Sequence, residues 1–227
     1  MAPSMSTIAV MQPYFFPYAG YFRLLAAADV FVLFDCVQFP RRGWVHRNRF
    51  RRADATLDWL TLPLAKAPRD ARIADLAFAP DAEAEMHARM ARFPALADAL
   101  DRHDPLVAGA AACAGRPNDY LAAQIATVAD RLGLCPRMVR SSTLDTPPDL
   151  RGAERIIHIV RQLGGRRYVN SPGGRALYTP DHFADAGLDL AFLVPYQNDM
   201  SSILDRLLRE PPADVRADIL AATQLVD

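Results

Sequence analysis

The N-terminal part of the chain contains two short apolar runs separated by a helical pattern, and this order limits the possible folds. Residues 8–11 and 30–34 are apolar and favour strands, whereas residues 21–28 have the composition of a helix. A strand, a helix and a second strand in this order form a right-handed βαβ unit. Because strand and helix patterns continue to alternate, we predict an α/β protein with a mostly parallel sheet and flanking helices, as in a Rossmann-like fold.

Residues 81–133 have helical patterns with no strand between them. Apolar residues recur there at three- and four-residue steps, which predicts one helix over 81–99 and another over 118–132. We expect these helices to form an insertion within a single α/β domain that spans residues 1–227. A further strand is predicted just before them, at residues 57–62.

Charge and composition narrow the function class. The chain has 26 basic and 26 acidic residues, and a net charge of zero argues against general nucleic-acid binding. No apolar run reaches the roughly 18 to 20 residues of a membrane span, and residues 1–7 lack the features of a signal peptide. Cys36, Cys113 and Cys135 fit neither a disulfide framework nor a zinc site. We therefore expect a protein of the bacterial cytoplasm, and we leave its oligomeric state open.

Positive charge is nevertheless concentrated in residues 38–52, which contain six arginines and no acid. Arginine side chains bind phosphate and carboxylate oxygens in pairs. The segment follows the predicted strand 30–34, and ligands of α/β proteins bind at the carboxyl ends of strands. We therefore predict a site for an anionic small molecule, with Arg42 and Arg47 as its main contacts. If the segment is extended, Arg47 and Arg49 share one face of a strand.

The loop predicted at residues 12–20 is rich in aromatic residues and punctuated by prolines. It is either an apolar plug that closes the end of the sheet or a platform that stacks a base or a sugar. In the second case the hydroxyl groups of Tyr14, Tyr18 and Tyr21 would contact the substrate.

Polar residues follow three predicted strands. Asp35 either caps the next turn or acts as a general base or metal ligand at the sheet edge. The residues 141–143 and 170–174 are either structural turns or parts of the site, because glycine-rich turns expose N–H groups to anions. His46 can titrate near neutral pH, but its spacing from other residues suggests no metal centre. The predicted catalytic residues are Asp35 and His46, and the predicted substrate-binding residues are Gln12, Tyr14, Tyr18, Tyr21, Arg42, Trp44, Arg47, Asn48, Asn170, Ser171, Gly173 and Gly174.

Several strings of the chain resemble the WbqC-like protein family. They include IAVMQPYFFPYAGYFRLL (8–25), DVFVLFDCVQFPRRGWVHRNR (29–49), GAERIIHIVRQLGG (152–165) and YVNSPGGRALY (168–178), in the family's order. The resemblance implies small-molecule biosynthesis, as in gene clusters for O-antigen in lipopolysaccharide and for other surface polysaccharides. It implies no catalytic residues. Residues 196–208 depart from the family pattern because they contain no tryptophan.

A second resemblance concerns the first loop. Gln12-Pro13 followed by Gly20-Tyr21 after a strand looks like the first loop of HIGH-type nucleotidyltransferases. In those enzymes histidines stabilise the nucleotide phosphates beside a helix N-terminus. Here Tyr18 and Tyr21 stand where histidines would be expected, which argues against adenylyl transfer by that mechanism.

We predict a cytoplasmic transferase for a phosphate- or carboxylate-bearing small molecule. The transferred group would be acyl or aminoacyl, or the substrate would be a nucleotide-activated sugar. The alternatives are an adenylating nucleotidyltransferase-like enzyme and a non-catalytic nucleotide-sugar binding protein. The partner is a small anionic molecule, a charged tRNA is less favoured because of the zero net charge, and the sequence identifies no cofactor.

Overall fold

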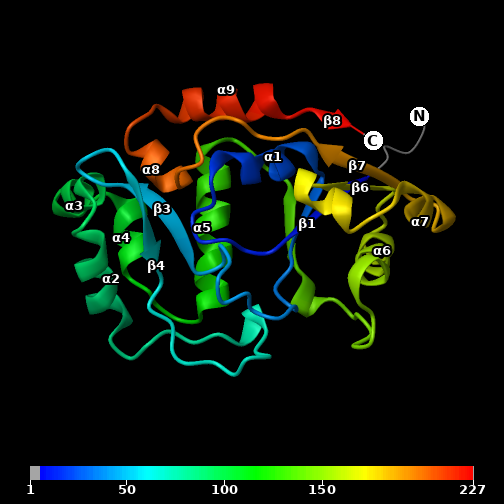
Figure 1. Ribbon diagram of the computed structural model, residues 1–227, viewed down its shortest axis with the longest axis horizontal. Coiled ribbons are helices and arrows are strands. Elements are labelled where there is room, and N and C mark those ends of the chain that lie inside the picture. The colour runs from blue at the N-terminus through cyan, green and yellow to red at the C-terminus, as the bar shows by residue number, and fades with distance from the viewer. Residues whose placement is uncertain (1–5, 227) are drawn as a thin grey trace.

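A six-stranded sheet forms the centre of the protein in a computed structural model that describes residues 6–226 (Figure 1). The strand order is β5-β2-β1-β6-β7-β8, and every neighbouring pair is parallel except β7 and β8. This confirms the predicted α/β class with a mostly parallel sheet. The expectation that residues 1–7 lack the features of a signal peptide concerns mainly residues outside the described range. The strands of this sheet are β1 (Thr7–Met11), β2 (Val30–Leu33), β5 (Arg137–Arg140), β6 (Arg167–Asn170), β7 (Asp189–Leu193) and β8 (Leu225–Val226).

Helices cover both faces of the sheet because successive residues of each strand point to opposite sides. In β1, Ala9 packs into one apolar core, whereas Ile8 and Val10 pack into a second core. The first core is covered by α1 (Ala19–Ala27), α5 (Pro117–Arg131), α8 (Ile203–Leu207) and α9 (Pro212–Ala222), and the second by α6 (Gly152–Gln162) and α7 (Pro180–Asp185). None of the helices within residues 6–226 is long and apolar enough to cross a bilayer.

The strand predicted at residues 57–62 exists but belongs to a separate two-stranded sheet. It is β4 (Leu57–Thr61), which pairs antiparallel with β3 (Arg47–Arg51). Only a short turn joins these strands, and a short turn produces a hairpin rather than the helical crossover that parallel strands need. Figure 1 shows this hairpin beside α2, α3 and α4, away from α6 and α7.

The insertion contains more and shorter helices than its sequence pattern predicts. The single helix predicted over 81–99 is wrong, since the chain forms α2 and then starts α3 at Pro94. Proline has no N–H to donate and is favoured in the first turn of a helix, so it restarts the helix there. The helices of this region are α2 (Ala82–Met90), α3 (Pro94–Asp101) and α4 (Pro105–Ala111), and the 3-10 helices of the chain are η1 (Ile73–Asp75), η2 (Ser141–Thr143) and η3 (Pro172–Ala176).

The aromatic loop, residues 12–18, is fixed by hydrogen bonds from three other elements. Phe16 has a φ of 36°, a strained region for a residue other than glycine. The Phe16 N–H donates to Gln124 Oε1 at 2.9 Å, and the Phe16 carbonyl accepts from Ser202 Oγ at 2.9 Å and from Asn48 Nδ2. Asn48 Nδ2 also donates to the carbonyl of Phe15 at 3.1 Å. These bonds join the aromatic loop to α5, β3 and the start of α8.

Asn48→Ala should destabilise the protein, because it leaves the buried carbonyl of Phe15 without the Asn48 donor. The loss of a buried hydrogen-bond partner costs about 1–3 kcal/mol of unfolding free energy. Urea unfolding followed by circular dichroism measures this change. The control is Gln197→Ala, at an exposed position, which should change the unfolding free energy by less than about 0.5 kcal/mol. Equal stability of the two variants would contradict the anchoring role.

Candidate functional site

The buried carboxylate of Asp35 organises the carboxyl edge of the sheet. Asp35 follows β2 and its exposed fraction is 0%. One oxygen accepts from Ser141 Oγ at 2.9 Å and from the Ser142 N–H at 2.8 Å. The other accepts from Ser142 Oγ at 2.7 Å and from Asn118 Nδ2 at 2.7 Å. An unpaired carboxylate would be very costly in this position, so these four donors are what allow Asp35 to be buried.

Ser141 also accepts hydrogen bonds from the backbone that follows β2. Its Oγ accepts from the N–H groups of Asp35 at 3.0 Å and of Cys36 at 3.1 Å. Asp35 and Cys36 follow β2, Ser141 and Ser142 follow β5, and Asn118 lies in the first turn of α5. We call these residues the Asp35 network. It fixes the ends of two adjacent parallel strands against the insertion.

A pocket of about 570 Å³ opens beside this network, and we call it the carboxyl-edge pocket. Such a volume is in the range of small-molecule sites, and the carboxyl ends of parallel strands are where α/β proteins bind ligands. The pocket is lined by Cys36, Val37, Gln38, Asp70, Arg72, Ser141, Ser142, Leu144, Thr146, Pro148, Arg151 and Arg155.

Three arginines and one acid give the carboxyl-edge pocket a positive balance. Arg72 pairs with Asp75 at 2.7 Å, outside the lining, and Arg151 donates to backbone carbonyls of its own loop. By contrast, Arg155 Nε and Thr146 Oγ1 are buried atoms with no hydrogen-bond partner within residues 6–226. Arg155 lies in the first turn of α6, whose N–H groups add partial positive charge. Arg155 and Thr146 both line the pocket, and a guanidinium at this place suits an anionic group of a ligand.

A second cluster combines aromatic rings and arginines from the predicted basic segment. The aromatic–arginine cluster consists of Tyr18, Trp44, Arg47, Arg49 and Trp59. The Trp44 ring lies 5.1 Å from the Trp59 ring and 6.4 Å from the Tyr18 ring. Arg47 Cζ lies 4.3 Å from the centre of the Trp59 ring, and Arg49 Cζ lies 5.4 Å from that of Trp44. The structure therefore brings the arginines of β3 to the aromatic loop.

The arginines of this segment use part of their donors within the protein. Arg47 Nη2 donates to the carbonyl of Arg42 at 2.7 Å, and Arg47 Nε donates to Gly43 at 3.3 Å. Arg42 is exposed in the preceding turn. Neither Arg42 nor Arg47 is among the described residues that line the carboxyl-edge pocket. Their binding of a substrate stays a prediction.

The predicted contacts of the aromatic loop have different environments. The buried Tyr21 hydroxyl donates to the carbonyl of Gln12 at 2.9 Å, and its ring lies 5.4 Å from that of Tyr14. Tyr14 and Tyr18 are half-buried, and burial raises the pKa of all three tyrosines. They remain neutral hydrogen-bonding groups at ordinary pH. Asn48, fully buried, anchors the loop as described above.

The turn after β6 lies at the same edge of the sheet but forms its own contacts. Buried Asn170 accepts from the Ser171 N–H at 2.7 Å and packs directly over Gly174. A Cβ atom at Gly174 would lie 2.1 Å from Asn170 Nδ2, so a larger residue there would displace the Asn170 side chain. Gly173 is exposed. The role of these residues in substrate binding stays a prediction.

His46 is half-buried at the start of β3, with its ring 5.0 Å from that of Phe39. Burial, with a smaller effect of the Arg47 charge, lowers the pKa of His46 to about 4. Its Nδ1 is buried without a hydrogen-bond partner in the described part of the chain. His46 is thus neutral near pH 7, and His46 does not line the carboxyl-edge pocket.

Thr146, Arg151 and Arg155 were missed by sequence reasoning. Arg151 and Arg155 are four residues apart at the start of a helix that follows a strand, which puts both side chains near one sheet edge. That spacing was the available signal. Within residues 6–226, no three His, Cys, Asp or Glu side chains gather as metal ligands would.

Comparison with known proteins identifies the family. The model of the WbqC-like protein family matches residues 12–216. The chain belongs to the WbqC-like protein family. It is also 37% identical over 60 residues to a Mycobacterium tuberculosis protein described as "Uncharacterized protein Rv1507c". That match covers 26% of this chain and 26% of the relative. No solved structure matches the chain.

The low pKa of His46 predicts a pH dependence of stability. The unfolded chain takes up a proton on His46 near pH 6.5, whereas the folded protein does so only near pH 4. The unfolded state therefore binds more protons between these values, and the unfolding free energy falls as the pH drops from 6.5 to 4. His46→Asn should lose less stability over this range, as measured by urea unfolding at several pH values.

The matched control is His87→Asn, at an exposed position on α2, which should keep the pH profile of the parent protein. A His46→Asn profile parallel to that of the parent would show that His46 is not the group responsible.

Proposed function

We propose that this WbqC-like protein binds a phosphate- or carboxylate-bearing small molecule in the carboxyl-edge pocket and acts on it as a transferase. The observation that carries the proposal is the gathering of Arg72, Arg151 and Arg155 against the single acid Asp70 in the lining of a pocket at the sheet edge. The family resemblance supports surface-glycan or related biosynthesis as the setting, and a nucleotide-activated sugar or an acyl donor as the substrate.

The three arginines supply the affinity in this proposal. Arg155 forms the direct pair with the anion, because it lines the pocket and its guanidinium has no ion pair within residues 6–226. Arg151 lies one turn before it at the N-cap of α6, and the N–H groups of the first turn favour negative charge. Arg72 pairs with Asp75 at 2.7 Å, so its charge is largely compensated and it contributes least of the three.

Asp35 acts through Ser142 in this proposal. Ser142 is exposed and lines the pocket, and its hydroxyl donates to Asp35 at 2.7 Å. Asp35 therefore orients this hydroxyl and lies within the distance that proton transfer needs. An acceptor hydroxyl that attacks the transferred group would pass its proton to Ser142 Oγ while Ser142 passes its own proton to Asp35, and the phosphate or thiolate of the donor would leave. This gives the predicted base Asp35 a role at the pocket without exposing it to solvent.

Arg155→Met tests the site, because methionine keeps much of the apolar side chain and removes the charge. Binding of UDP-sugars, ATP and acyl thioesters is screened by thermal shift and measured by calorimetry. A ligand of the parent protein should bind Arg155→Met about tenfold or more weakly, since a charged hydrogen bond contributes about 1.5–3 kcal/mol.

The matched control is Arg42→Met, in the exposed turn before β3. It should bind the same ligand with unchanged affinity. Loss of binding in Arg42→Met together with full binding in Arg155→Met would move the site to the basic segment. A ligand that binds but yields no product with any acceptor would favour the non-catalytic binding protein.

A further inference from the structure

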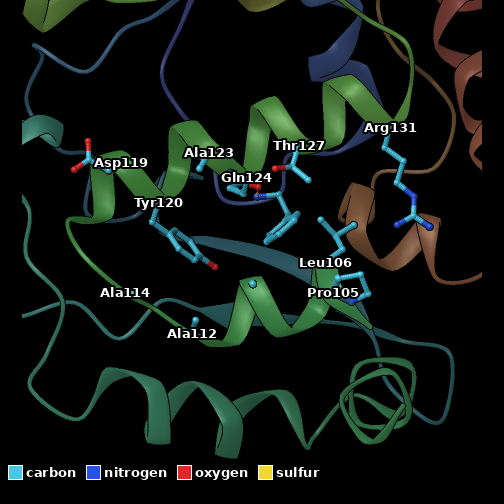
Figure 2. Close-up of a pocket in the computed structure, with 12 residues that line it drawn as sticks. Pro105, Leu106, Ala112, Ala114, Asp119, Tyr120, Ala123, Gln124, Thr127 and Arg131 are labelled. Atoms are coloured by element: carbon cyan, nitrogen blue, oxygen red, sulfur yellow. Dashed lines mark hydrogen bonds between the residues drawn. The ribbon is translucent and has the colours of Figure 1, made fainter. Parts of the chain in front are cut away.

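An apolar cavity of about 480 Å³ lies between α4 and α5 and is separate from the carboxyl-edge pocket (Figure 2). The α5 wall includes Tyr120 and Gln124, and the α4 wall includes Gly109. Phe16 of the aromatic loop also lines the cavity. A Cβ atom at Gly109 would meet no atom within 4 Å, so the space beside α4 is open. Cavities of roughly 300–1,000 Å³ commonly hold small molecules.

Two of the polar side chains that line this cavity, Tyr120 and Gln124, are hydrogen-bonded within the protein, and Thr127 adds a hydroxyl to the same wall. The Tyr120 hydroxyl donates to the carbonyl of Ala110 at 2.8 Å. Gln124 Oε1 accepts from the Phe16 N–H at 2.9 Å, and Gln124 Nε2 donates to the carbonyl of Tyr14 at 2.6 Å. Apart from the Thr127 hydroxyl, the remaining wall is mainly carbon surface, which suits an occupant with an apolar middle.

The two ends of the cavity differ in charge. Figure 2 shows Asp119 at one end of α5 and Arg131 at the other, beside Pro105 and Leu106. Asp119 pairs with Arg140 of β5, so its charge is compensated. Arg131 is exposed in the last turn of α5, and its guanidinium has no ion pair within residues 6–226. One end of the cavity therefore offers an available cation.

We propose that the cavity binds a medium-chain carboxylic acid, with the acyl chain between α4 and α5 and the carboxylate on Arg131. The carbon walls suit the chain, and the Arg131 guanidinium complements a carboxylate, which it can bind with two parallel hydrogen bonds. The cavity is distinct from the carboxyl-edge pocket, so this assignment stands independently of the proposed transferase function.

Gly109→Leu tests the acyl-chain part of the site. Leucine fills the open space beside α4 and favours a helix more than glycine does, so the variant should fold with a raised melting temperature. Titration with decanoate below its micelle concentration should show saturable binding to the parent chain and none to Gly109→Leu. The matched control is Ala108→Leu, at an exposed position on the same helix outside the cavity, which should bind as the parent does.

Arg131→Gln tests the head-group part. Decanoate should bind this variant about two- to fivefold more weakly than the parent, because an ion pair at the exposed Arg131 is lost. Decan-1-ol, which has no carboxylate, should bind the parent and Arg131→Gln equally. Arg155→Met, in the carboxyl-edge pocket, should bind decanoate normally, which separates a failure of this site from a failure of the proposed function.

Absence of saturable decanoate binding to the parent chain would overturn the proposal. Undiminished binding to Gly109→Leu would also overturn it, because the chain would then lie elsewhere. Equal affinity of the parent for decanoate and decan-1-ol would show that Arg131 does not bind the carboxylate, and it would contradict this part of the proposal.

Discussion

The hydrogen bonds to Asp35 join three parts of the chain that are far apart in the sequence. A carboxylate with an exposed fraction of 0% is tolerable only when donors surround it, and those donors come from the segment after β5 and from α5. Ser141 and Ser142 are thereby positioned at the end of β2, and the chain continues from them along the carboxyl-edge pocket to α6. The geometry of the pocket consequently depends on this one buried charge.

Helix α5 connects the sheet edge to the insertion. Asn118 in its first turn donates to Asp35, and the next residue, Asp119, pairs with β5 and lines the apolar cavity. Further along the helix, Gln124 holds the strained backbone of Phe16. The aromatic loop is therefore neither a plain plug nor a free platform, since Phe15 and Phe16 are buried whereas Tyr18 is half-buried against Trp44.

Much of the fold could be predicted because strand and helix periods are local properties. The apolar runs 8–11 and 30–34 form adjacent parallel strands, and Asp35 lies at a strand end as expected. The break before Pro94 was missed because the apolar spacing continues across it, although proline restarts the helix. The pairing of residues 57–62 was missed because a strand pattern does not specify its sheet.

The site was harder to predict than the fold. The arginines of residues 38–52 are conspicuous in the sequence, but strand order decides which loops meet, and the sequence does not give strand order. β5 lies next to β2, which brings Ser142, Thr146 and Arg155 to the sheet edge where Asp35 follows β2. Counting charges along the sequence places the anion site in the dense basic segment. An isolated arginine such as Arg155, whose Nε is buried without a partner in the described residues, does not stand out in such a count.

The central claim is that an anion binds beside the Asp35 network rather than on the basic segment. The most direct test follows the amide chemical shifts by NMR while inorganic phosphate, or a nucleotide shown to bind the parent protein, is added. The account predicts that the largest changes fall on residues 36–38, 141–146 and 151–155, around the carboxyl-edge pocket. Changes concentrated on Arg42, Arg47 and Arg49, with residues 141–155 unaffected, would contradict it.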